Sequence, residues 1–244
     1  MIFSGKSDVG KRRANNQDCF AITPLSHGAV LCTVCDGMGG MSGGNIASEI
    51  ACRVFTEIVQ GGFSSEHTED GALLRHAVSL ANTAVYEAAA ADEALKGMGT
   101  TLVAALIRAD GSVTVVNVGD SRLYCLNGDL LRQVTHDHSY VQYLVDMGQI
   151  TMKEAKTASI RNIIIRSVGN EPETTPDIFS LAPEQDTYLL LCSDGLTGCV
   201  PNEVIATHIR AESQEELDAR VEALIALANK GGGNDNITVV LAKL

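Results

Sequence analysis

Positive charge is scarce in this sequence. Its 244 residues include 18 Lys plus Arg against 30 Asp plus Glu, which gives a formal net charge of −12 at pH 7 and an isoelectric point near 4.8. Sequence-independent binding of nucleic acid depends on Lys and Arg side chains that neutralise phosphates. We therefore expect no nucleic-acid partner.

Long apolar runs are also missing. The residues Met1–Lys6 lack the apolar stretch of a secretory signal, and no uncharged run approaches the ~18 residues of a membrane helix. The seven cysteines are an odd number, scattered from Cys19 to Cys199, mostly inside apolar runs. They fit reduced core residues rather than a disulfide framework. We therefore expect a cytoplasmic protein that makes no use of a membrane.

Linkers, repeats and low-complexity segments are absent as well, so residues 1–244 are expected to form one domain. Apolar residues at three- and four-residue spacing predict helices over 45–59 and 69–91, and a Ser213–Glu216 capping box opens another over 213–229. A weakly apolar helical segment, broken at Gly148, predicts an exposed flap at about 140–165. Strands are predicted at 19–23, 29–35, 101–107, 113–118, 121–126, 130–135, 163–168, 178–181, 188–192 and 237–241.

The helices come in pairs between groups of antiparallel strands. The dipeptides Asp110-Gly111 and Asn127-Gly128 are typical of tight hairpin turns between such strands. This order favours an α+β fold of stacked layers over a doubly wound parallel sheet.

Two aspartates follow the same local plan. Asp36-Gly37 and Asp194-Gly195 each end an apolar run of buried-strand character, and the segment that follows each is helical in character. Asp-Gly is also the commonest tight-turn dipeptide, so a single instance would mean little. At the end of a buried strand, however, it holds a short carboxylate on a rigid support.

Carboxylates that lie side by side raise one another's pKa unless a cation sits between them. An all-oxygen ligand set selects a hard ion such as Mg²⁺ or Mn²⁺ over zinc. Asp18, before the first predicted strand, and Asp235, before the last, are further candidates for the same cluster.

Seven short motifs are spread along nearly the whole chain. They are Arg13–Asp18, Asp36–Gly40, Gly99–Thr101, Val118–Arg122, Thr135–Ser139, Ser193–Gly195 and Asp235–Thr238. These motifs occur in the order found in the metal-dependent protein phosphatases of type 2C, and the chain resembles the bacterial branch of that family over residues 5–242. The resemblance implies a four-layer α-β-β-α sandwich, with two antiparallel sheets flanked by helix pairs and a helical flap.

The resemblance also implies a site for two metal ions. Asp36 matches the carboxylate that bridges them, and the carbonyl of Gly37 matches a ligand of one ion. Asp194 and Asp235 match the remaining direct ligands, whereas Asp18 matches an acid that acts through metal-bound water. The implied cofactor is Mn²⁺ or Mg²⁺.

Two further roles follow from the resemblance. Asp120 matches a ligand of a third, weaker metal site, and Arg13 matches the side chain that binds the substrate phosphate. Met38 stands where eukaryotic relatives carry a histidine taken to be the general acid, and a thioether cannot donate a proton. His136 and His138 are alternatives as proton donor, although a structural role beside the site is the simpler interpretation.

The implied enzyme is a Mn²⁺/Mg²⁺-dependent protein serine/threonine phosphatase. It would hydrolyse phosphoserine and phosphothreonine monoesters by direct attack of a metal-bridged water or hydroxide, with no phosphoenzyme. Its partners would be phosphorylated proteins, including a cognate serine/threonine kinase. Residues 140–165 are where selectivity among them is expected.

Other classes of protein are less well supported. One alternative is a catalytically weak relative that only binds phosphoproteins. The segment Gly5–Arg12 nearly matches a nucleotide-binding phosphate loop, but Arg12 occupies its Ser/Thr position. No cysteine has an arginine six positions later, as a cysteine-dependent phosphatase requires, and Cys32 and Cys35 fit a buried strand.

Overall fold

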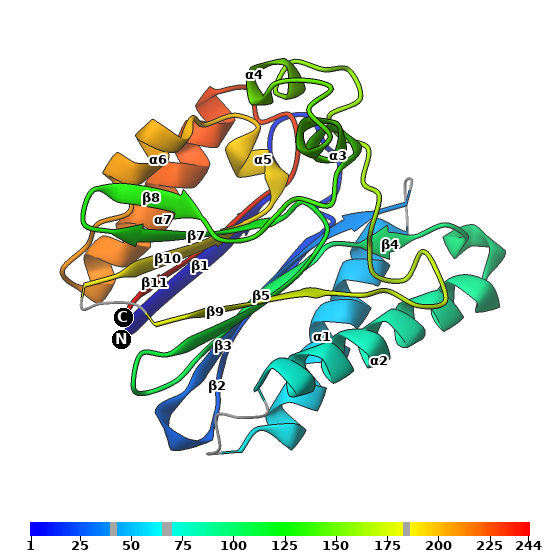
Figure 1. Cartoon of the computed structure of the whole chain (residues 1–244), viewed down its shortest axis with the longest axis horizontal. Coiled ribbons are helices and arrows are strands. Elements are labelled where there is room, and N and C mark those ends of the chain that lie inside the picture. The colour runs from blue at the N-terminus through cyan, green and yellow to red at the C-terminus, as the bar shows by residue number, and fades with distance from the viewer. Residues whose placement is uncertain (40–42, 65–69, 183–185) are drawn as a thin grey trace.

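The computed structural model describes residues 1–39, 43–64, 70–182 and 186–244, and within them two antiparallel sheets lie face to face (Figure 1). Sheet A has the strand order β1 (Ile2–Asp8), β11 (Ile237–Lys243), β10 (Tyr188–Cys192), β7 (Arg122–Asn127) and β8 (Leu130–Gln133). Sheet B has the order β2 (Asp18–Pro24), β3 (Val30–Met38), β5 (Leu102–Ile107), β6 (Val113–Val118) and β9 (Asp177–Leu181), and β4 (Gly99–Thr100) pairs with the end of β3.

Helices cover the outer faces of both sheets (Figure 1). The long helices α1 (Gly44–Gly62) and α2 (Asp70–Ala91) pack on sheet B. On sheet A lie α5 (Asp194–Thr197), α6 (Asn202–His208) and α7 (Gln214–Lys230). The expected four-layer α+β sandwich is therefore confirmed.

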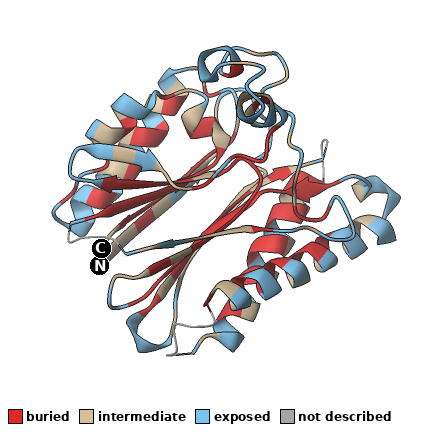
Figure 2. Cartoon of the chain, in the orientation of Figure 1, coloured by how far each residue is buried: buried red, intermediate tan, exposed pale blue. Residues whose placement is uncertain are grey.

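Three apolar layers hold the sandwich together, because most central strands are buried on both faces. In β5, for example, Leu102 and Leu106 pack toward α1 and α2, whereas Val103 and Ile107 pack between the sheets. Figure 2 shows this burial running through the strands of both sheets. The ends of such strands are rigid supports for side chains at the rim of the sandwich.

The first strand, β1, was not predicted from the sequence. Residues Ile2–Asp8 mix apolar and polar side chains, and the strand exists because it pairs along its whole length with β11, from Ile2 opposite Lys243 to Asp8 opposite Ile237. This pairing also answers the nucleotide-loop alternative, since Gly5–Asp8 is extended strand rather than a phosphate-binding loop.

The flap region contains α3 (Tyr140–Asp146) and α4 (Met152–Ala155), separated by Gly148 at φ +68. The strand predicted over 163–168 is wrong. Only two isolated bridges occur there, Ile164 with Ser139 and Val168 with Thr100. No neighbouring strand runs alongside residues 163–168 in the described part of the chain, so this mainly apolar segment forms no ladder and leaves Ile163 and Ile165 exposed.

Local predictions at element ends fared better. Asp110-Gly111 forms the predicted turn between β5 and β6, with Gly111 at φ +84. Ser213 caps α7, because its Oγ accepts a hydrogen bond from the Glu216 amide. The Glu216 carboxylate accepts a hydrogen bond from the Glu212 amide, and not the bond from the Ser213 amide that a capping box requires. Gly40 of the Asp36–Gly40 motif and residue 69, the first residue of the helix predicted over 69–91, lie outside the described residues.

In the described part of the chain, none of the helices combines the length and apolar character needed to span a bilayer.

Candidate metal centre and active site

The candidate carboxylates lie at strand ends that come from distant parts of the sequence. Asp18 and Asp36 are directly opposite each other in the β2–β3 pair. Asp194 opens α5 two residues after the last residue of β10, and Asp235 stands two residues before the first residue of β11, the neighbour of β10 in sheet A. Asp120 stands in the turn between β6 and β7, strands that belong to different sheets.

These carboxylates interact electrostatically. Burial, followed by the charges of Asp18, Asp194, Asp120 and Asp235, raises the pKa of Asp36 well above its usual range. The fold therefore brings the five predicted acids into one electrostatic cluster.

The pKa values of three other members are raised as well. Burial and then the Asp194 charge raise the pKa of Asp120 to about 8. Burial is also the main cause for Asp18 and Asp194, each of which has a pKa raised to about 6. A cluster of this kind favours the binding of positive charge, because every carboxylate is more easily ionised beside a cation.

Only one of the two carboxylate oxygens of Asp18 accepts hydrogen bonds among the described residues. Its Oδ2 accepts hydrogen bonds from Ser193 Oγ at 2.8 Å and Thr238 Oγ1 at 2.6 Å. Its Oδ1 is buried and has no hydrogen-bond partner among the described residues. A buried carboxylate oxygen left without a donor is a natural position for a cation or for a cation's water.

Arg13 already supplies one positive group at the rim. Its Nη2 lies 2.8 Å from Asp235 Oδ2, and this hydrogen bond is the main cause of its raised pKa, with further contributions from the charges of Asp36 and Asp194. The Arg13 side chain is half-exposed, so the guanidinium stands between the acidic cluster and solvent. An anion can therefore reach the Arg13 guanidinium from solvent.

The backbone of Asp36 is fixed by two threonines of the Gly99–Thr101 motif. Thr101 Oγ1 accepts the Asp36 amide at 2.9 Å, while the Thr101 amide and the Thr100 hydroxyl both donate to the Asp36 carbonyl at 2.9 Å. Thr101 Oγ1 also shares a 2.7 Å hydrogen bond with Ser121 Oγ, next to Asp120. The motif thus connects two acids of the cluster without contributing a charge of its own.

The loop that carries Asp120 is held by His138. The Gly119 amide donates to His138 Nδ1 at 3.0 Å, and the His138 amide donates to the Gly119 carbonyl at 3.0 Å. Nδ1 is thus an acceptor, so the neutral ring carries its proton on Nε2, which lies 3.2 Å from Asp177 Oδ2. Burial lowers the pKa of His138. This is the structural role that the sequence favoured over proton donation.

Arg122 and His136 also have clear partners. Arg122 forms a bidentate pair with Asp137, its Nε and Nη2 lying 2.9 and 2.6 Å from the two carboxylate oxygens, so the Val118–Arg122 and Thr135–Ser139 motifs bind each other. His136 Nε2 lies 2.8 Å from Asp146 Oδ2 at the end of α3.

Glycine follows Asp36 and Asp194 for a reason that the sequence did not reveal. A Cβ on Gly37 would lie 2.0 Å from the Gly44 carbonyl oxygen and 2.6 Å from that of Gln17. A Cβ on Gly195 would lie 1.9 Å from the Asn236 carbonyl oxygen. These glycines allow protein segments to approach each other closely, in addition to any approach of a ligand.

The donor set fits a hard divalent ion. All candidate ligand atoms are oxygens, and the five carboxylates outnumber the two arginines, Arg13 and Arg122, whose charges act on them. Within the described residues, no three His, Cys, Asp or Glu side chains stand close enough to enclose an ion by themselves. Mg²⁺ and Mn²⁺ tolerate such a site, because they commonly keep several waters as ligands.

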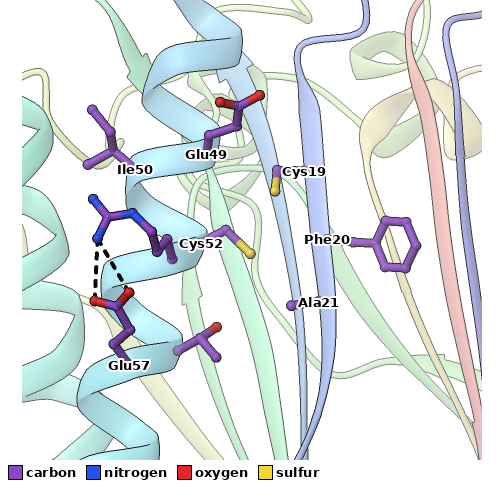
Figure 3. A pocket seen from close by; sticks show the side chains of 9 residues that line it. Cys19, Phe20, Ala21, Glu49, Ile50, Cys52 and Glu57 are labelled. Atoms are coloured by element: carbon purple, nitrogen blue, oxygen red, sulfur yellow. Dashed lines mark hydrogen bonds and ion pairs between the residues drawn. The ribbon is translucent and has the colours of Figure 1, made fainter.

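A separate cavity of about 590 Å³ lies between α1 and β2 (Figure 3). Cys19 and Cys52 line it together with Glu49, Ile50 and Glu57, and no acid of the cluster does. The Cys19 and Cys52 side chains form a hydrogen bond, which is the main cause of the raised pKa of Cys19. All seven cysteines are free, and five are buried. Burial raises the pKa of Cys32 and of Cys192 to about 12, so these two thiols stay protonated, which agrees with a core role.

Sequence reasoning missed the residues that support the acids. Ser193, Thr238 and Asn236 all lie inside the recognised motifs, but only the acids had been given roles. The sequence signal that could have identified them is their position, because each stands one to three residues from a candidate ligand.

Comparison with known proteins identifies the family to which this chain belongs. The family model described as protein phosphatase 2C matches residues 7–241. The serine/threonine phosphatase Stp of Listeria monocytogenes is 36% identical over 241 residues, which cover 98% of this chain and 94% of that protein.

Solved structures agree in fold over nearly the whole chain. The Streptococcus agalactiae serine/threonine phosphatase superposes with a TM-score of 0.91 at 38% identity, covering 98% of this chain and 97% of that one. The catalytic domain of the phosphatase PstP, solved in complex with 2 manganese ions, gives a TM-score of 0.86 at 34% identity, covering 99% and 96% of the two chains.

The protein belongs to the protein phosphatase 2C family and is of the bacterial type. It is a serine/threonine phosphatase, a class of enzyme that depends on metal ions.

Proposed function

We propose that this chain, acting as one catalytic unit over residues 1–244, hydrolyses phosphoserine and phosphothreonine monoesters with two core Mn²⁺ or Mg²⁺ ions. The observation that carries the proposal is the electrostatic interaction of five aspartates, four of which have pKa values raised by burial and by the charges of their neighbours. Asp36 interacts with every other member, as a bridging ligand should.

The residues divide into three roles. Asp36, the Gly37 carbonyl, Asp194 and Asp235 would hold the two core ions, and Asp18 would act through a bound water at its unpartnered Oδ1. Asp120 and Asp194, whose charges interact, would hold a third ion. When bound, such ions lower the pKa of a water nucleophile and stabilise the charge of the phosphoryl group.

Arg13 would orient the phosphate. Its planar guanidinium can form two parallel hydrogen bonds to phosphate oxygens, which fixes the phosphorus for in-line attack. The Arg13–Asp235 ion pair is partly exposed and so is weak enough to exchange for a phosphate partner. Because the tautomer and contacts of His138 tie it to the Asp120 loop, we assign it no proton transfer.

The flap would contact the protein part of the substrate. Of the exposed large apolar side chains in the described part of the chain, six lie between residues 140 and 165. They are Tyr140, Tyr143, Met147, Met152, Ile163 and Ile165. Apolar side chains gathered in one exposed region are typical of an interaction surface. We propose phosphorylated proteins as partners, among them a cognate serine/threonine kinase, in the cytoplasm.

Hydrolysis of p-nitrophenyl phosphate and of a phosphothreonine peptide tests the proposal. Turnover should require added Mn²⁺ or Mg²⁺ and should be lost in Asp36→Asn and Asp194→Ala. Asp110→Asn, in a turn outside the cluster, is the matched control and should retain activity. Full activity in EDTA would contradict the proposal. Metal-dependent retention of the peptide without turnover would support a phosphoprotein-binding module instead.

A further inference from the structure

The side chain of Asn236 is buried at the centre of the site, with the residue only 4% exposed. Its Oδ1 accepts the Gln17 amide at 2.8 Å. Its Nδ2 donates to the Val9 and Asn15 carbonyls, both at 3.0 Å. Each polar atom of this amide is therefore used, and every partner belongs to one segment, residues 9–17.

The backbone of Asn236 reaches the other ligand-bearing segments. Its amide donates to Asp235 Oδ1 at 2.9 Å. Its carbonyl is close to the Ser193 hydroxyl, at 3.5 Å, and packs against Gly195, where a Cβ would lie 1.9 Å away. Asn236 thus contacts the neighbours of Asp18 and Asp194 as well as Asp235 itself.

The segment 9–17 joins β1 to β2 and carries Arg13. Besides its bonds to Asn236, it is held by the Lys11 amide, which donates to the Gly233 carbonyl at 2.8 Å. Arg13 lies between these anchor points, at Lys11 and Asn15, and its own side chain binds Asp235. The distance between Arg13 and Asp235 therefore depends on how Asn236 holds the segment.

We propose that Asn236 is a positioning residue that sets segment 9–17, and with it Arg13 and Asp18, in place against Asp235. Only an amide supplies what the site requires, an acceptor on one atom and two donor hydrogens on the other. An aspartate would turn an acceptor toward the Val9 and Asn15 carbonyls and leave them unpaired. The assignment rests on the proposed function for the role of Arg13, but the structural part of it does not.

The first test needs no catalysis. Asn236→Asp is compared with Asn234→Asp, an exposed neighbour that adds the same charge. Amide hydrogen exchange is followed by mass spectrometry in metal-free protein. We expect exchange in residues 9–17 to be about tenfold faster in Asn236→Asp only, since the loss of a buried hydrogen bond corresponds to roughly that factor. Unchanged protection there would overturn the proposal.

The second test asks whether Asn236 acts through Arg13. With p-nitrophenyl phosphate and saturating Mn²⁺, Asn236→Asp should raise KM about tenfold and change kcat less, because phosphate binding is what Arg13 provides. In an Arg13→Ala background the same substitution should change KM less than twofold.

An equal rise of KM in both backgrounds would show that Asn236 acts independently of Arg13, and would overturn the positioning role. Asn236→Ala serves as the second variant if Asn236→Asp fails to fold. If wild-type protein hydrolyses nothing, the proposed function fails, whereas the exchange result still decides the structural part.

Discussion

The hydroxyl of Thr101 accepts a hydrogen bond from the backbone amide of Asp36 at 2.9 Å. An uncharged side chain therefore helps to fix the position of Asp36, the acid that interacts with every other member of the cluster. Thr101 is fully buried, and its hydroxyl also pairs with Ser121. The predicted bridging carboxylate therefore depends on a hydrogen-bond network that joins β3, the start of β5 and the Asp120 turn.

Replacing Thr101 by Val should destabilise the protein and impair activity. The Asp36 amide and the Ser121 hydroxyl would both lose a buried partner, at a cost of about 1–3 kcal/mol in the free energy of unfolding. Urea denaturation measures this cost. Thr33→Val is the matched control, because Thr33 is equally buried in β3 and its Oγ1 has no partner in the described part of the chain. Equal losses in the two variants would refute the role of Thr101.

The stability of the metal-free protein should fall as the pH rises from about 4 to 8. Folded-state pKa values of about 6 for Asp18 and Asp194, and about 8 for Asp120, lie above the unfolded values. The folded state then binds more protons than the unfolded state in this range, so raising the pH favours unfolding.

Thermal unfolding in EDTA at pH 5, 6.5 and 8 checks this pH dependence. Asp36→Asn removes one of the repelling charges and should lose less stability between pH 5 and 8 than wild type does. We expect a difference of several degrees, since 1 kcal/mol corresponds to about 2–4 °C in a domain of this size. Mn²⁺ should reverse the decline in wild type. A wild-type melting temperature that rises with pH in step with the variant would contradict the electrostatic cluster.

Arg13→Lys should raise KM for p-nitrophenyl phosphate by about tenfold, because an ammonium group cannot form the bidentate contact of a guanidinium. Inhibition by inorganic phosphate should weaken in parallel. Arg12→Lys, an exposed neighbour with the same change in chemistry, is the control. If the two substitutions gave the same KM, Arg13 would have no special contact with the phosphate.

The flap should affect peptides rather than small esters. Tyr143 is 46% exposed and its ring stacks on Tyr140, so Tyr143→Ala removes part of the apolar surface without opening the core. We expect a KM several-fold higher for a phosphothreonine peptide and an unchanged KM for p-nitrophenyl phosphate. Tyr86→Ala, exposed on α2, is the control. Unchanged peptide kinetics would remove the flap from substrate recognition.

Much of the architecture could be predicted because local patterns carried it. Buried strands such as Tyr188–Cys192 are continuous apolar runs, and α1 and α2 show helical spacing of their apolar residues. The strand Ile2–Asp8 and the bridges around 163–168 could not be predicted in this way, because pairing with a partner, or its absence, decides their form.

The candidate site divides in the same manner. The sequence by itself indicated which acids to propose as metal ligands, since Asp36 and Asp194 end apolar strands and the order of the motifs matches a known family. Only the tertiary structure decided which side chains hold those acids, how far their pKa values rise, and that Asn236 joins the segments that carry them. The physical reason is that burial and hydrogen bonding between residues more than two hundred positions apart depend on the packing of the two sheets, which no local pattern encodes.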